Sequence, residues 1–345
     1  MTKILHSLTL LRKSGGSGFI AAHLVDQLLN KGHTVVTTVR SEDKARKIRS
    51  AYKDLADRVE VAIVPDIAQE HAFDEVVKTP GLEVVMHTAS PFHFNWTDPK
   101  KELVDPALVG TTSILKALKR SAPSVKRVVV TSSFASIMDE HHIEDPSHTF
   151  SESSWNPVTI DDVTRSPATA YRVSKKLAER AAWDFVAAEK PAFDLVTVCP
   201  PMVFGPVVPH FASIETINTS NERIVALLRG QWKDGIPMAA PVPLWIDVRD
   251  VALAHVRAAE IPEAAGRRLF TTAGWFTNRA IADAVRAKFP EFQDRLPGPD
   301  VKGGEAPSPV FQYNNDETTK LLGIDWIPLE KSITELAAQL KDLGI

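Results

Sequence analysis

The chain has 345 residues, of which 44% are hydrophobic and 24% are charged. This length exceeds one domain of average size, and the composition is typical of a globular protein, which excludes disordered, collagen-like and membrane-spanning chains. Lys and Arg total 40 against 43 for Asp and Glu, so the formal net charge is -3. A chain so close to neutral has no overall attraction for nucleic acid or for an anionic membrane, and neither is predicted as a partner.

A single cysteine, Cys199, cannot form a disulfide within the chain. A chain of this size without disulfides fits a reducing compartment, and the cytoplasm is the expected location. The first 25 residues contain no acid and include Lys3, Arg12 and Lys13, so a mitochondrial presequence is the alternative. The cytoplasm is favoured because a glycine-rich turn, described below, needs the preceding residues as its strand.

Short β-branched runs alternate with longer amphipathic segments along the first 200 residues. Strands are predicted at residues 33–39, 59–64, 82–87, 127–132 and 193–199. Helices are predicted at residues 19–30, 41–56, 68–78, 105–120 and 170–189. This alternation is typical of right-handed βαβ units, so the sequence predicts an α/β fold with a doubly wound, parallel Rossmann sheet.

The pattern changes after Cys199, where Pro200, Pro201, Pro206 and Pro209 interrupt any regular element. Further helices are predicted at residues 221–228, 248–260, 278–289, 315–322 and 329–343. We therefore expect a nucleotide-binding Rossmann domain at residues 1–200. Residues 201–345 are expected to form a smaller, mixed substrate-binding region, part of which returns to the first domain.

A glycine-rich turn at residues 14–21 precedes the first predicted helix and places small residues at positions 15, 18 and 21. Glycines allow a sharp turn and a close backbone approach, and the helix N-terminus offers unpaired N–H groups, so this pattern predicts a dinucleotide pyrophosphate site. The alternative is an ordinary glycine-rich turn. The candidate cofactor-binding residues here are Gly15, Ser17, Gly18, Phe19 and Ile20.

The strand before this turn is expected at residues 8–11. Arg12 and Lys13 follow where two more apolar residues are typical, so either these charges lie at an exposed strand end or the strand is weakened.

The end of the second strand selects between the two nicotinamide nucleotides, because an acid there binds the ribose 2′-hydroxyl of NAD. This chain has Arg40 at that position, and Lys44 follows one helical turn later. Both cations can converge on a 2′-phosphate, so NADPH is predicted over NADH. The alternative is an exposed pair neutralised by Glu42 and Asp43.

Two further strand ends are candidate cofactor contacts, since ligands of doubly wound sheets bind at the carboxyl ends of the strands. Asp66 and Ile67 are placed to address the adenine, whereas Thr88, Ala89 and Ser90 would let the backbone approach the dinucleotide.

Tyr171 and Lys175 are four residues apart, on one face of a predicted helix. A phenol with a pKa of about 10 is a poor acid near neutrality unless a cation favours its ionised form, and Lys175 supplies that cation. Ser132 and Ser133 end the fifth strand and bring a hydroxyl to the same crevice. Such a Tyr-Lys spacing also arises by chance on helix surfaces, but its place after a Ser-Ser strand end favours a catalytic site.

Aromatic residues near these strand ends are candidate walls of a substrate pocket, with ordinary core packing as the alternative. They are Phe92, Phe94, Trp96, Phe134, Phe204 and Trp245. His141 and His142 are interpreted as part of a solvated loop, and no metal is predicted.

From Ser14 onward the chain resembles the extended short-chain dehydrogenase/reductases, and among them the dihydroflavonol-reductase-like group with the yeast and fungal NADPH-dependent aldehyde and methylglyoxal reductases. The motifs that carry the resemblance are GGSGFIA at 15–21, VR at 39–40 with Lys44, TSS at 131–133, YRVSK at 171–175, CPPMVFGP at 199–206 and DVRDVA at 247–252.

The resemblance implies that Ser133 is the catalytic serine, Tyr171 the proton donor and Lys175 its activator, with Ser132 as a possible substitute for Ser133. It also implies that Pro200 to Val203 line the nicotinamide carboxamide. The expected activity is reduction of aldehydes or ketones by NADPH, in a monomer or homodimer. The alternatives are a sugar-nucleotide epimerase or dehydratase that retains NAD, and a non-catalytic NADP-sensing regulator.

Overall fold

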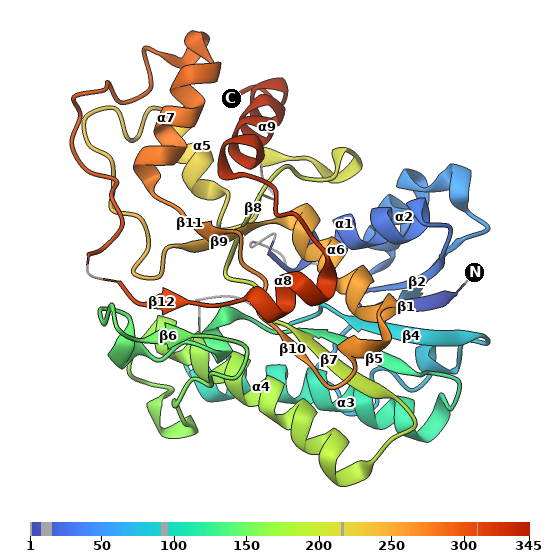
Figure 1. Ribbon diagram of the computed structural model, residues 1–345. Helices are drawn as coiled ribbons and strands as arrows, with labels where there is room; N and C mark the ends of the chain where they lie inside the picture. The colour runs from blue at the N-terminus through green and yellow to red at the C-terminus, as the bar shows by residue number, and fades with distance from the viewer. Residues whose placement is uncertain (1, 8–15, 91–95, 215–216, 309) are drawn as a thin grey trace.

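The computed structural model describes residues 2–7, 16–90, 96–214, 217–308 and 310–345 (Figure 1). Its strands are β1 (Lys3–Ser7), β2 (Thr34–Val39), β3 (Val59–Ile63), β4 (Leu82–His87), β5 (Arg127–Thr131), β6 (Thr149–Phe150), β7 (Asp194–Val198), β8 (Met202–Phe204), β9 (Leu244–Asp247), β10 (Arg268–Leu269), β11 (Gly274–Trp275) and β12 (Gln312–Tyr313). Its α-helices are α1 (Gly16–Asn30), α2 (Glu42–Ala51), α3 (Asp105–Ser121), α4 (Pro167–Glu189), α5 (Glu222–Leu228), α6 (Val248–Glu260), α7 (Asn278–Lys288), α8 (Asp316–Leu322) and α9 (Leu329–Asp342).

Seven parallel strands form the main sheet, in the order β10-β7-β5-β4-β1-β2-β3. The chain runs outward from β1 to β3, then returns to β4 on the other side of β1 and continues toward β10. This reversal of strand order leaves a crevice at the carboxyl ends of the strands, where doubly wound folds bind their ligands. The predicted Rossmann sheet is confirmed.

Helices cover both faces of this sheet, which explains why its central strands are almost continuously apolar. One face packs against α1, α2 and α6, and the other packs against α3 and α4 (Figure 1). Each face therefore has its own hydrophobic core.

The C-terminal region has a third core, in which α5, α7 and α9 pack around β8, β9 and β11 (Figure 1). Other parts of the same region pack against elements of the first 200 residues. Strand β10 pairs with β7, β12 pairs with β6, and α6 packs against α1 in the core on one face of the sheet. Residues after Pro200 therefore form a core of their own and also contribute to the core on one face of the main sheet.

The first strand of the described residues is β1, residues 3–7, whose Ile4, Leu5 and His6 are buried between the two helix layers. Residues 8–11 and the charges at Arg12 and Lys13 lie outside the described residues.

The helix predicted at residues 68–78 is instead a series of turns that ends in a short 3-10 helix, Val76–Lys78. Asp66 accepts hydrogen bonds from the backbone N of Ala68 at 2.9 Å and from the Gln69 side chain at 2.9 Å. These local hydrogen bonds compete with helical ones at the start of the segment.

Arg127 joins the amino ends of β5 and β7 to the end of α6. Its guanidinium binds both carboxylate oxygens of Asp194, at 2.7 and 3.0 Å, and donates to the carbonyl oxygens of Ala258, Ile261 and Pro262 at 2.9, 2.5 and 3.1 Å. The Arg127 side chain is only 9% exposed.

We expect Arg127→Met to lower the free energy of unfolding by about 3 to 5 kcal/mol, because the carboxylate and three carbonyl oxygens lose their donor. Lys31→Met is the matched control. It removes a solvent-exposed ion pair with Glu260 and should cost less than about 1 kcal/mol. Urea unfolding measures both variants, and equal losses would contradict the structural role of Arg127.

Candidate active site

A cleft of about 160 Å³ lies at the carboxyl ends of the main-sheet strands. It is lined by Phe19 and Ile20 of α1, Thr88 and Ser90 after β4, Thr131, Ser132 and Ser133 at the end of β5, Tyr171 and Lys175 of α4, Pro200, Pro201 and Val203, and Asn218, Thr219 and Ser220. The structure thus brings most of the predicted cofactor-binding and catalytic residues to one place.

Local sequence sets the start of the helix that carries Tyr171 and Lys175. The Ser166 hydroxyl caps α4 by accepting a hydrogen bond from the backbone N of Thr169 at 3.0 Å, and Pro167 occupies the first helical position. Tyr171 and Lys175 follow one turn apart, with Lys175 Nζ 5.9 Å from the centre of the Tyr171 ring.

Burial governs the ionisation of both side chains. It raises the pKa of Tyr171, and a side-chain hydrogen bond with Ser133 lowers that pKa in part. Burial also lowers the pKa of Lys175 to about 8, against the opposing influence of the Glu179 carboxylate. Tyr171 is therefore protonated near neutrality, as a proton donor must be, while Lys175 lies close to its titration range.

The two serines at the end of β5 face different partners. Ser133 hydrogen-bonds Tyr171 and accepts from the backbone N of Ala135 at 3.1 Å. The Ser132 hydroxyl donates to the carboxylate of Glu179 at 2.5 Å. Of the two hydroxyls, Ser133 is thus the one positioned beside the tyrosine.

The glycine-rich turn is described only in part. Gly15 and the Ser17 side chain lie outside the described residues, whereas Gly18 and Phe19 are buried and α1 begins at Gly16. Phe19 and Ile20, from the first turns of α1, line the cleft. The helix N-terminus therefore points its early residues at the predicted dinucleotide site.

Arg40 follows the last residue of β2, and Lys44 lies in the first turn of α2. Burial lowers the pKa of Lys44 to about 8, and repulsion by the nearby Arg40 contributes to the shift. Of the two nearby acids, Glu42 pairs with Arg49 at 2.6 Å, and Asp43 pairs with Arg46. The repulsion between Arg40 and Lys44 means that the two cations lie close together, as an anion-binding site requires.

The other candidate cofactor-binding residues follow β3 and β4, and only some of them line the cleft. Thr88 and Ser90 line the cleft, and the Thr88 hydroxyl lies 3.0 Å from Nε2 of the buried His6. Ala89 is buried. The Asp66 carboxylate makes the turn contacts given above, and Ile67 packs in a sheet core, so neither is brought to the cleft.

Most of the predicted aromatic walls are not brought to the cleft either. Phe134 stacks on Phe270, with ring centres 5.0 Å apart, in an aromatic cluster that also contains Phe150 and Phe311. Phe204 and Trp245 are buried in the C-terminal core. Trp96 packs on a separate core cluster, and Phe92 and Phe94 lie outside the described residues. For Phe134, Phe204 and Trp245 the core-packing alternative describes the structure.

Four cleft-lining residues were not singled out as site residues from the sequence: Thr131, Asn218, Thr219 and Ser220. Residues 218–220 belong to a polar loop before α5, and its composition carries no distinctive motif. Asn218 is held by a hydrogen bond from its side-chain N to the carbonyl oxygen of Val203 at 3.2 Å. One wall of the cleft is thus polar rather than aromatic.

Among the described residues, no group of three or more His, Cys, Asp or Glu side chains is arranged to hold a metal ion. His142 instead stacks on His148, with ring centres 4.2 Å apart. None of the helices in the described part of the chain is both long enough and apolar enough to cross a lipid bilayer.

The chain matches the NAD dependent epimerase/dehydratase family over residues 14–270. It therefore belongs to this family, and the resemblance drawn from its motifs is confirmed.

Relatives with assigned names match nearly the whole chain. A ketoreductase of Aspergillus niger is 43% identical over 332 residues, which cover 95% of this chain and 96% of the relative. An NADPH-dependent methylglyoxal reductase of Saccharomyces cerevisiae is 37% identical over 333 residues, which cover 95% of this chain and 96% of the relative. A crystal structure of yeast methylglyoxal/isovaleraldehyde reductase complexed with NADPH has a TM-score of 0.90, with 36% identity and 99% of both chains covered.

Proposed function

We propose that this protein is an NADPH-dependent carbonyl reductase that converts aldehydes or ketones to alcohols. The observation that carries the proposal is the hydrogen-bonded pair of Ser133 and Tyr171, beside Lys175, in one cleft with the start of α1. The named relatives support it, since they include a ketoreductase and an NADPH-dependent reductase and match this chain almost end to end.

The described residues fit a bound NADPH. The cleft offers hydroxyl and ammonium donors from Thr88, Ser90 and Lys175, which suit the oxygen atoms of a dinucleotide. The first turn of α1 supplies unpaired backbone N–H groups and a positive dipole end for the pyrophosphate. The mutual repulsion of Arg40 and Lys44 would be relieved by a 2′-phosphate between them.

When bound, NADPH supplies the hydride that reduces the carbonyl carbon of the substrate. The Ser133 hydroxyl would donate a hydrogen bond to the carbonyl oxygen and hold it next to Tyr171. The Tyr171 hydroxyl would give its proton to that oxygen as negative charge develops on it. Lys175 in its ammonium form stabilises the phenolate that Tyr171 becomes, so it makes Tyr171 a stronger acid.

The polar wall of the cleft bears on the substrate class. The side-chain O of Asn218 is buried and makes no hydrogen bond within the described structure, so it offers an acceptor to a substrate hydroxyl or to a water molecule. This favours carbonyl compounds that carry a second polar group.

We also propose that the enzyme acts in the cytoplasm, as a monomer or a homodimer. Its single cysteine is buried, and burial raises the pKa of the Cys199 thiol to about 12, which fits a protein that keeps its cysteine reduced.

NADPH oxidation against a carbonyl panel tests the proposal. The panel spans methylglyoxal, aliphatic aldehydes, bulky aryl ketones and dihydroflavonols, and turnover of at least one class is expected. Purified protein that carries tightly bound NAD and reduces no member of the panel would favour the epimerase or dehydratase alternative. NADPH binding without turnover would favour the non-catalytic regulator.

Tyr171→Phe should lower kcat by about 10²- to 10⁴-fold, because the variant keeps the ring but has no proton to donate. NADPH binding, measured by fluorescence titration, should remain detectable. Tyr313→Phe is the matched control, since Tyr313 lies in β12 outside the cleft lining, and its kcat should stay near that of the parent. A near-parent kcat in Tyr171→Phe would overturn the proposed role of Tyr171.

Arg40→Ala should weaken NADPH more than NADH, raising the ratio of their KM values by about 10- to 100-fold, the range for a hydrogen bond to a charged group. Arg46→Ala is the matched control, because Arg46 is exposed and paired with Asp43. Steady-state kinetics with both nucleotides provide the measurement. An unchanged preference in Arg40→Ala would contradict the 2′-phosphate site.

A further inference from the structure

Helix α4 carries a third polar residue on the face that bears Tyr171 and Lys175. Glu179 follows Lys175 by four residues, so the three side chains lie one turn apart on the same face of the helix. The Glu179 side chain has no exposed surface. A buried carboxylate is costly unless it is paired and hydrogen-bonded, so its surroundings decide whether it stays charged.

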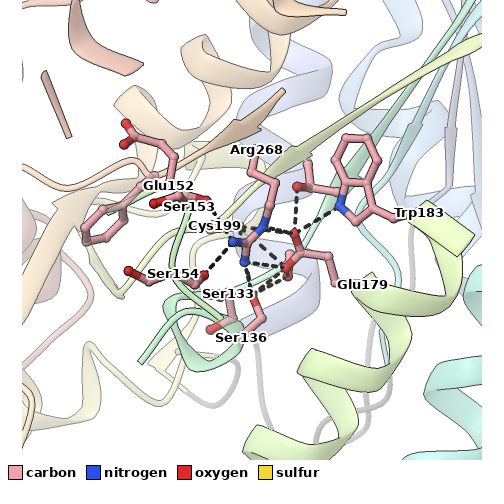
Figure 2. Close-up of polar contacts among 12 residues, drawn as sticks. Ser133, Ser136, Glu152, Ser153, Ser154, Glu179, Trp183, Cys199 and Arg268 are labelled. Carbon is pink, nitrogen blue, oxygen red and sulfur yellow. Dashed lines mark hydrogen bonds and ion pairs between the residues drawn. The ribbon is translucent and has the colours of Figure 1, made fainter. Parts of the chain in front are cut away.

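Hydrogen-bond donors surround both oxygens of this carboxylate (Figure 2). Oε1 accepts from Arg268 Nε at 2.7 Å, Thr197 Oγ1 at 2.8 Å and Trp183 Nε1 at 3.3 Å. Oε2 accepts from the hydroxyls of Ser132, at 2.5 Å, and Ser136. Burial by itself would raise the pKa of Glu179, but the ion pair with Arg268 and these hydrogen bonds outweigh it and lower the pKa. Glu179 is therefore ionised at neutral pH.

Arg268 is held in place from the other side. It lies in β10, and its guanidinium donates to the carbonyl oxygens of Glu152 and Ser154 at 2.7 and 2.6 Å. The guanidinium also lies 3.7 Å from the centre of the Trp155 ring. Its position is thus set by several contacts besides Glu179.

The hydrogen bonds of Glu179 reach the turn that carries the candidate catalytic serine. Ser132 precedes Ser133, and Ser136 lies three residues after it. The Ser136 hydroxyl is also 2.7 Å from the carbonyl oxygen of Ser133. Glu179 therefore holds both ends of residues 132–136, from which Ser133 presents its hydroxyl to Tyr171.

Glu179 also shares a small cavity of about 10 Å³ with Lys175. His87 of β4 borders the same cavity, and burial lowers the pKa of His87 to about 3, so its ring is neutral. Cys199, after β7, also faces the carboxylate, and its thiol is neutral because burial raises its pKa to about 12. Of the residues that line this cavity, only Glu179 is acidic, and Arg268 does not line it.

We propose that Glu179 is a positioning residue of the reductase: its negative charge keeps Lys175 in the ammonium form, and its hydrogen bonds hold the turn that presents Ser133 to Tyr171. The effect of Glu179 on catalysis rests on the proposed function. Its effect on the ionisation of Lys175 does not. The competing role is purely structural: the ion pair would only allow α4 and β10 to pack together.

Glu179→Gln and Glu179→Asp separate these roles. Both variants disturb the hydrogen bonds, but only Gln removes the charge. An amine is protonated below its pKa, so loss of a neighbouring negative charge lowers the pKa of Lys175 and moves the loss of activity to lower pH. We expect the alkaline limb of kcat/KM to shift down by about one pH unit in Glu179→Gln, about tenfold in the amine-to-ammonium ratio. Glu179→Asp should keep the parent limb.

A second measurement needs neither cofactor nor turnover. Trace labelling of Lys175 with acetic anhydride, followed by mass spectrometry across a pH series, reports the fraction of free amine in the protein alone. In Glu179→Gln this fraction should rise at lower pH than in the parent and in Glu179→Asp.

If the unpaired Arg268 prevents Glu179→Gln from folding, the double variant Glu179→Gln/Arg268→Gln removes both charges. It should still show a downward shift of the Lys175 pKa, but a smaller one, because loss of the Arg268 cation favours the ammonium form. Parent-like labelling in the folded Gln variant, or equal shifts in Gln and Asp, would overturn the proposal. A parent protein that reduces no carbonyl compound would refute the proposed function instead, while the labelling result would still decide the effect on Lys175.

Discussion

The ion pair between Glu179 and Arg268 connects α4, the helix of Tyr171 and Lys175, to the two-residue strand β10, 89 residues later in the chain. A helix face with a polar residue at every fourth position cannot be buried against a sheet unless each polar group finds a partner. Tyr171 finds Ser133, and Glu179 finds Arg268 and two serine hydroxyls. The return of β10 to the main sheet is therefore a condition for burying this face.

The cleft is built from both parts of the chain. The end of β5 and helix α4 supply Ser133, Tyr171 and Lys175, whereas the segment after Pro200 supplies Val203 and the polar loop at residues 218–220. Gly205 lets that segment turn, because its φ is +126° and a Cβ there would lie 3.0 Å from the Asp247 carboxylate and from Val248. The C-terminal region shapes the cleft while the sheet holds the candidate catalytic groups.

Features with a local signature could be predicted from the sequence. The strand and helix alternation, the tyrosine-lysine spacing and the cation pair at Arg40 and Lys44 each depend on residues close together in the chain. The pairing of β10 with β7 and the burial of Phe134 among aromatic residues depend on contacts across more than 60 residues. Glu179 had no signature, since an acid near the middle of a helix usually faces solvent.

The proposed function depends on hydride transfer from NADPH to a carbonyl carbon in this cleft, and a deuterium label follows that transfer. NADPH labelled with deuterium at C4, in separate (4R) and (4S) forms, would be incubated with the enzyme and an accepted carbonyl substrate, and the alcohol analysed by mass spectrometry. One deuterium is expected on the carbinol carbon from one of the two forms and none from the other. An alcohol without deuterium from both forms, or with equal label from both, would contradict it.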